Sequence, residues 1–101
     1  MDNLESKIEL LIGTKQEGEY WDFKQCYHTS NSALLHDIIC MANNRSNMDG
    51  YIIFGIEDKT FEIIGVEEDK NRKNQQNIID FLNGKHFARG IRPTIQLVTL
   101  Q

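Results

Sequence analysis

Apolar residues recur at helical spacing in three parts of the chain. They predict amphipathic helices over residues 2–12, over about 32–43 and around 78–82. Glycine is favoured just beyond a helix end, and Gly13 and Gly84 follow the first and third of these patterns. We therefore expect three helices separated by shorter elements.

The stretches between the helices have the length and pattern of β-strands. We expect a strand over about 19–25, a β-hairpin over 50–66 around the turn-forming segment EDKT, and a last strand over 94–100. The predicted fold class is α+β. It is a small two-layer sandwich in which helices pack on a mixed β-sheet, in the order α-β-α-β-β-α-β.

The chain has 101 residues, which is enough for one hydrophobic core but too few for two. We expect a single domain over residues 1–101. Because the chain ends within or just after the last predicted strand, we also expect it to be the N-terminal part of a longer protein. No apolar run approaches the roughly 18 residues of a membrane-spanning helix, and the acidic N-terminus is unlike a secretory signal. The expected location is the cytoplasm, with no membrane partner.

Charge is distributed unevenly along the chain. The formal net charge of −4 argues against a simple nucleic-acid coat protein, because such a domain is usually basic throughout. Residues 1–69 hold fourteen acidic and five basic residues, whereas 70–92 hold six basic residues and one acidic residue. The six candidates for nucleic-acid binding are Lys70, Arg72, Lys73, Lys85, Arg89 and Arg92. This basic end is either a phosphate-contacting patch or a solvated helix face followed by a loop.

The strand over about 19–25 divides its side chains between two faces. Alternation places Trp21 and Phe23 on one face, which we expect to lie in the core. It places Tyr20, Asp22 and Lys24 on the other face. That second face is available for chemistry.

The cysteines and histidines do not form a recognisable motif. Cys26 and Cys40 lack CxxC spacing and, without a secretion signal, are expected to be reduced thiols. His28, His36 and His86 have no metal-ligand spacing, so no zinc site is predicted. The chain also has no GxxxxGK[ST] loop, so no nucleotide cofactor is predicted.

Several short motifs occur in the order found in one known family. They are carried by Glu17, Asp22, Phe23 and Lys24, by Ala42 and Asn43, by Gly50, by FGIED at 54–58 and by IIGVE at 63–67. In this order they resemble the Schlafen-type, Alba-related domain, and the resemblance covers roughly residues 4–100. Two departures are Asp22, where the family usually has Glu, and the turn ANNRSNMDG, which is longer than the usual A-N-T-x-G-G.

The resemblance implies a nucleic-acid-binding domain and, in one branch of the family, a metal-dependent endonuclease that acts on structured RNA. Its three carboxylates would map to Glu17, Asp22 and Asp58 and would hold Mg²⁺ or Mn²⁺, which prefer hard oxygen ligands. Lys24 lies on the same strand face as Asp22 and would orient a phosphate or the attacking water. The alternative is that Glu17 is merely solvated and that Asp58 belongs to a hairpin turn without binding an ion.

Three functions remain open from the sequence. The first is a module of a larger regulatory or defence protein that binds RNA or DNA through the basic end. The second is an Mg²⁺- or Mn²⁺-dependent endoribonuclease that uses the three carboxylates. The third is a protein–protein assembly domain, including a homo-oligomer in which two copies join through an unpaired sheet edge.

Overall fold

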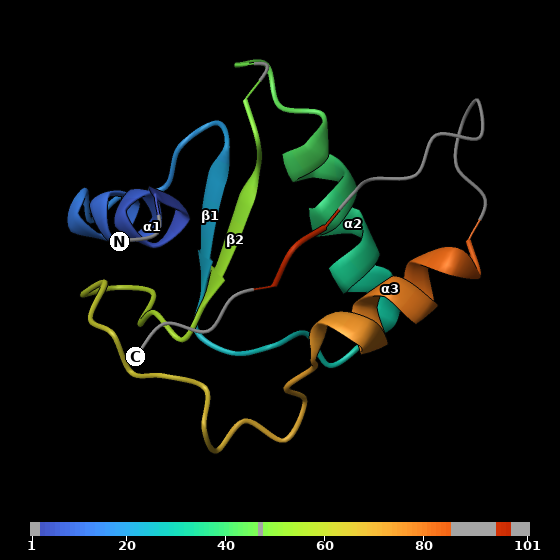
Figure 1. Cartoon of the computed structure of the whole chain (residues 1–101). Coiled ribbons are helices and arrows are strands. Elements are labelled where there is room, and N and C mark those ends of the chain that lie inside the picture. The colour runs from blue at the N-terminus through green and yellow to red at the C-terminus, as the bar shows by residue number, and fades with distance from the viewer. Residues whose placement is uncertain (1–2, 47, 86–94, 98–101) are drawn as a thin grey trace.

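The structure describes residues 3–46, 48–85 and 95–97, and these contain three helices and two strands. In this computed structural model the elements are α1 (Asn3–Gly13), β1 (Trp21–Lys24), α2 (Asn31–Ala42), β2 (Tyr51–Phe54) and α3 (Gln75–Asn83) (Figure 1). β1 and β2 are parallel neighbours, and the chain passes between them through α2. Such a crossover is needed because the chain must return to the end of the sheet where β1 began.

Helices lie on both sides of the strand pair. Figure 1 shows α1 on one side and α2 with α3 on the other. The register places Asp22 beside Ile52 and Lys24 beside Phe54, so these four side chains share one face of the sheet. Ile52 and Phe54 pack against the hydrophobic cluster of α2 and α3. Asp22 and Lys24 therefore face α2 and α3, and not α1.

The main hydrophobic cluster joins α2 to α3. Its buried members are Leu34 and Ile38 of α2 and Ile78 and Leu82 of α3. Each pair is spaced by four residues, so it lies on one face of its helix. Full burial of such a side chain stabilises the fold by about 1.5–3 kcal/mol, so this cluster contributes substantially to the packing of α2 and α3 on the sheet.

Side-chain caps set where α2 and α3 begin. Ser30 Oγ accepts a hydrogen bond from the backbone N–H of Ala33 (3.2 Å). At α3, Asn74 and Asn77 form a capping box, in which each side chain accepts from the backbone N–H of the other residue. These caps satisfy N–H groups that the first turn of a helix leaves unpaired.

The α+β class and the three helices are confirmed, and the helices that were predicted over 2–12 and 32–43 begin and end within one residue of α1 and α2. The predicted hairpin is present only in part. β2 is its first strand, but the returning segment is joined to it by a single antiparallel bridge between Ile56 and Ile63. Phe61 and Gly65 have φ angles of 59° and 80°, which interrupt an extended strand on either side of that bridge.

Two finer features of the predicted fold differ from the structure. Helices on both sides of the strand pair replace the predicted two layers, because β1 also has an apolar face, on which Phe23 meets Phe61 edge to face at 5.6 Å. Of the strand predicted over 94–100, only 95–97 are described and these are not in a strand; the other residues of that segment lie outside the described residues. None of the described helices is long and apolar enough to cross a membrane.

Candidate functional site

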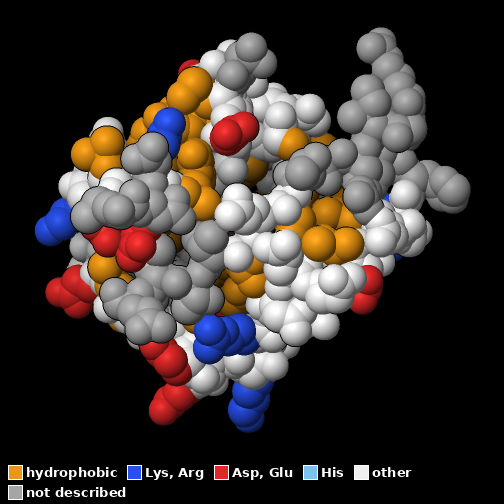
Figure 2. Space-filling view, viewed as in Figure 1, with side chains coloured by type: hydrophobic (Ala, Val, Ile, Leu, Met, Phe, Trp, Pro, Cys, Tyr) orange, Lys and Arg blue, Asp and Glu red, His pale blue; other side chains and the backbone are white. Residues whose placement is uncertain are grey.

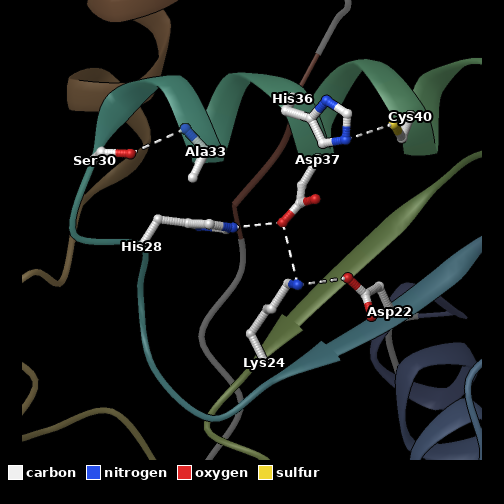
Figure 3. A network of polar contacts seen from close by, with 8 residues as sticks. All are labelled: Asp22, Lys24, His28, Ser30, Ala33, His36, Asp37 and Cys40. Atoms are coloured by element: carbon white, nitrogen blue, oxygen red, sulfur yellow. Dashed lines mark hydrogen bonds and ion pairs between the residues drawn. The ribbon is translucent and has the colours of Figure 1, made fainter.

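A chain of polar contacts runs from β1 to α2 on the face of the sheet that α2 covers (Figure 3). Lys24 Nζ lies 3.1 Å from Asp22 Oδ2 and 3.3 Å from Asp37 Oδ2. The same Asp37 oxygen lies 2.6 Å from His28 Nε2. We call Asp22, Lys24, His28 and Asp37 the polar network. It joins the strand, the loop that follows the strand, and the middle of α2.

His28 is the most enclosed member of the polar network. Its side chain is only 9% exposed, and its ring meets Phe54 edge to face at 5.9 Å. His28 Nδ1 is buried and has no hydrogen-bond partner in the described part of the chain. Among the described residues, the contact with Asp37 is therefore the polar contact that holds the ring, and Figure 3 shows Nε2 directed at that carboxylate.

The charges of the polar network reinforce one another. Partial burial alone would raise the pKa of Asp37, but hydrogen bonds from His28 and Lys24 outweigh it and lower the pKa below its ordinary value. Partial burial opposes the charged form of Lys24 as well, but the hydrogen bonds and charges of Asp22 and Asp37 raise its pKa. Lys24 is therefore an ammonium ion at neutral pH, shared by two carboxylates.

Glu17 lies near Asp22 and Lys24 of the polar network. The interaction with the neighbouring Asp22 carboxyl group, followed by partial desolvation and the charge of Asp22, raises the pKa of Glu17. A cation beside both carboxylates would reduce the repulsion that contributes to this raised pKa. Glu17 and Asp22 thus form an adjacent pair, which we call the carboxylate pair.

Asp58 is not gathered with the carboxylate pair. It lies in the turn after β2, where it contributes to the environment of Glu57. Hydrogen bonds from the backbone and hydroxyl of Thr60, with smaller effects from Lys59 and Asp58, lower the pKa of Glu57 to about 2. Within the described ranges, no group of three or more His, Cys, Asp or Glu side chains is arranged to hold a metal ion. The predicted three-ligand set is therefore not preassembled, because its third member belongs to a separate turn.

The predicted basic residues Lys70, Arg72 and Lys73 lie on the loop that leads into α3. Asp69 fixes the start of this loop, since its Oδ2 accepts from Tyr27 N–H (2.6 Å) and its Oδ1 accepts from Asn71 N–H (2.9 Å). At the other end, the Tyr27 hydroxyl donates to the carbonyl of Lys73 (3.4 Å). We call residues 69–73 the basic loop.

Tyr27 is itself held firmly in the fold. It is 4% exposed, and its ring stacks on Phe54 with a centroid distance of 4.0 Å and an interplanar angle of 8°. The basic loop is therefore attached at both ends to a buried residue that packs on β2. The fold therefore holds the backbone of the loop that carries Lys70, Arg72 and Lys73 in place.

The cations of the basic end are accessible. Lys70, Arg72 and Lys85 are exposed and Lys73 is half-buried, and none of the four forms an ion pair with another described residue. Lys85 lies over the Phe81 ring at 5.0 Å, at the end of α3. Figure 2 shows Lys and Arg side chains at the lower end of the molecule, over the loop between β2 and α3, with acidic side chains beside them. The predicted Arg89 and Arg92 lie outside the described residues.

Four residues that build these sites were not predicted from the sequence: His28, Asp37, Tyr27 and Asp69. A signal exists for Asp37, because it precedes Ile38 on a helix whose neighbouring positions are buried, and a charge at the border of a buried face requires a partner. Tyr27 and Asp69 are 42 residues apart, and no local pattern links them.

The sequence matches the family described as Schlafen, AlbA_2 over residues 17–101, which is most of the chain. The chain belongs to the Schlafen, AlbA_2 family. No curated protein and no solved structure matches it. The carboxylate pair, the polar network and the basic loop all lie within the matched part of this Schlafen/AlbA_2 domain.

Proposed function

We propose that this Schlafen/AlbA_2 domain is a nucleic-acid-binding module that grips the phosphate backbone of RNA or DNA with its basic loop. The observation that carries the proposal is the attachment of the loop to Tyr27 at both ends, which holds Lys70, Arg72 and Lys73 in place without pairing them. Cations that are already positioned lose less conformational freedom when a phosphate binds.

The acidic residue within the basic loop, Asp69, is engaged in the fold. Asp69 is engaged by two backbone N–H groups, so part of its charge is neutralised within the fold. Lys85 and the predicted Arg89 and Arg92 would extend the cationic surface along the chain beyond α3. Because the rest of the protein is acidic, the nucleic acid is expected to contact the domain through this local basic surface alone. Its phosphates would bind the basic loop, and the rest of the domain would not touch the nucleic acid.

The proposal is tested by charge reversal with a matched control. Replacement of the three loop cations with glutamate is expected to weaken binding of fluorescently labelled RNA and DNA by at least about a hundredfold, measured by anisotropy. The control replaces Lys15, Arg45 and Lys59, which are exposed elsewhere, with glutamate and so makes the same change in net charge. Equal losses in the two variants would show that net charge, and not the basic loop, determines binding.

A second candidate function is favoured by the carboxylate pair. Mg²⁺ is commonly held by one or two carboxylates together with substrate phosphates, so Glu17 and Asp22 fit this partial role without a third protein ligand. When bound, the ion would activate water and stabilise charge on the phosphoryl oxygens. Lys24, beside Asp22, would orient a phosphate only in competition with Asp37, which already pairs with it.

Endoribonuclease activity is tested by incubating labelled RNA with the protein and Mn²⁺ or Mg²⁺, and with EDTA as the control. The Asp22→Asn variant is expected to lose metal-dependent cleavage, and Asp58→Asn separates two forms of the site. Loss in both variants would mean that Asp58 joins the carboxylate pair when substrate binds. Loss in Asp22→Asn alone would mean that phosphate completes the coordination. Cleavage that survives in an Asp22→Ala, Asp58→Ala double variant would refute this function.

A further inference from the structure

Among the residues that the structure describes, the returning arm of the partial hairpin has an unpaired outer edge. Two backbone hydrogen bonds flank the Ile56–Ile63 bridge, from Glu57 N–H to the Glu62 carbonyl (2.9 Å) and from Ile64 N–H to the Gly55 carbonyl (2.7 Å). This arrangement makes Ile56 and Ile63 a non-hydrogen-bonded antiparallel pair. In such a pair the N–H and C=O of the two residues point away from each other.

The two sides of this pair differ in what they meet. Ile56 N–H points toward β1, where it donates to the Lys24 carbonyl (3.2 Å). The N–H and C=O of Ile63 must then point outward, and neither has a hydrogen-bond partner among the described residues. We call residues 62–64 the edge segment. Within the described ranges, its central residue Ile63 has an unpaired backbone donor and an unpaired backbone acceptor.

Apolar side chains accompany this open backbone. Ile63 is 72% exposed and Ile64 is 50% exposed. They are consecutive, so they point to opposite faces of the edge segment. An exposed edge with apolar side chains on both faces is a surface that pairs readily with another strand.

We propose that the edge segment is a self-association surface, on which two copies of this chain pair antiparallel about a twofold axis at Ile63. In an antiparallel hydrogen-bonded pair, the two opposed residues exchange both of their N–H···O=C bonds. Ile63 offers one outward donor and one outward acceptor, so a second copy placed by a twofold axis satisfies both and leaves neither over. A twofold interface is self-complementary in this same way.

The register that follows also avoids charge repulsion. It places Ile63 opposite Ile63 of the partner subunit, and Glu62 opposite Ile64 of the partner subunit. No carboxylate therefore faces another across the pair, although the surrounding chain is acidic. Because Phe61 and Gly65, with positive φ, bound the edge segment, the interface is short and its association is reversible. This inference is independent of the proposed function, since the basic loop takes no part in it.

The test measures molar mass against concentration by sedimentation equilibrium, from about 10 µM to about 1 mM, the range in which small interfaces associate. Ile63→Lys is expected to weaken the dimer at least about tenfold, because two ammonium groups would face each other. Ile63→Glu is expected to weaken it similarly, whereas an equimolar mixture of the two variants is expected to restore dimers. Leu10→Lys, at a residue of α1 that is 71% exposed, is the matched control and is expected to leave association unchanged.

A cross-link tests the register separately. In a background with Cys26 and Cys40 replaced by serine, a Glu62→Cys, Ile64→Cys double variant is expected to form covalent dimers on mild oxidation, because opposed positions of a non-hydrogen-bonded pair lie close enough for a disulfide. Wild-type protein that remains monomeric throughout the concentration range would overturn the proposal. So would association that Ile63→Lys and Leu10→Lys change equally, or a double variant that does not cross-link.

Discussion

Replacement of Asp37 with alanine removes the carboxylate on which Lys24 and His28 converge. His28 Nε2 loses a partner at 2.6 Å, and the ring, which is 9% exposed, is left with no hydrogen-bond partner among the described residues for either nitrogen. A buried polar group that loses its hydrogen bond costs about 1–3 kcal/mol. Lys24 is 33% exposed and keeps Asp22 at 3.1 Å, so its share is below about 1 kcal/mol. We expect Asp37→Ala to lower the free energy of unfolding by about 2–3 kcal/mol in total.

Urea denaturation followed by circular dichroism near neutral pH measures this loss. The matched control is Asp80→Ala on α3, where the exposed carboxylate accepts from Gln76 (2.8 Å). Both substitutions gain the same helix propensity of alanine, so the difference between them isolates the polar network. We expect Asp80→Ala to change the free energy of unfolding by less than about 0.5 kcal/mol.

A double-mutant cycle identifies which partner matters. In a His28→Leu background no buried nitrogen remains to be orphaned, so Asp37→Ala is expected to cost about 1 kcal/mol or less. The pKa of Asp37 is lowered in the folded state, so its contribution is present above its ordinary value of 3.8 and is lost as the pH falls through the lower folded value. Equal costs of Asp37→Ala in the two backgrounds, or a cost equal to that of Asp80→Ala, would refute this reasoning.

Other consequences follow from the basic loop, the turn after β2 and the core. Asp69→Ala is expected to weaken RNA or DNA binding about fivefold in anisotropy assays, although it removes a negative charge, because the freed loop must be ordered on binding. The control, Glu68→Ala, removes the same charge without freeing the loop and should strengthen binding. The amide chemical shift of Thr60 is expected to titrate with Glu57 near a pKa of about 2. The turn then keeps its hydrogen bonds at pH values well below the ordinary glutamate pKa of 4.5 and loses them as the pH falls through about 2. A midpoint near 4.5 would contradict the assignment. Leu82→Ala, at 1% exposure, should lower the free energy of unfolding by about 2–5 kcal/mol in the same urea assay, and a loss below about 1 kcal/mol would place Leu82 outside the core.

Local patterns predicted the three helices and the alternation along β1, although Trp21, expected in the core with Phe23, is only half-buried. Alternation alone places Asp22 and Lys24 on one face, and the structure confirms that they share the face covered by α2. The pairing of Lys24 with Asp37 could not be predicted in this way. It depends on how α2 packs across β1, which the sequence spacing of either element does not specify.

The sites built from distant segments were the least predictable. The attachment of the basic loop joins Tyr27 to Asp69, and neither residue belongs to a recognisable motif. Asp58 is separate from the carboxylate pair because it lies in the turn after β2. In that turn, Glu57 accepts hydrogen bonds from the backbone N–H and the hydroxyl of Thr60. The order of the motifs identified candidate site residues, whereas tertiary contacts determine which of these residues lie close together.

The salt dependence of nucleic-acid binding tests the role of the basic loop most directly. Each phosphate contact by a lysine or arginine contributes about 0.7–0.9 to the slope of log K against log salt concentration. With Lys70, Arg72 and Lys73 replaced by glutamate, we expect the magnitude of the slope to fall by about 2–3, while the Lys15, Arg45 and Lys59 control keeps the wild-type slope. Equal slopes for wild type and the loop variant, or no binding by the wild-type protein at low salt, would contradict the proposed function.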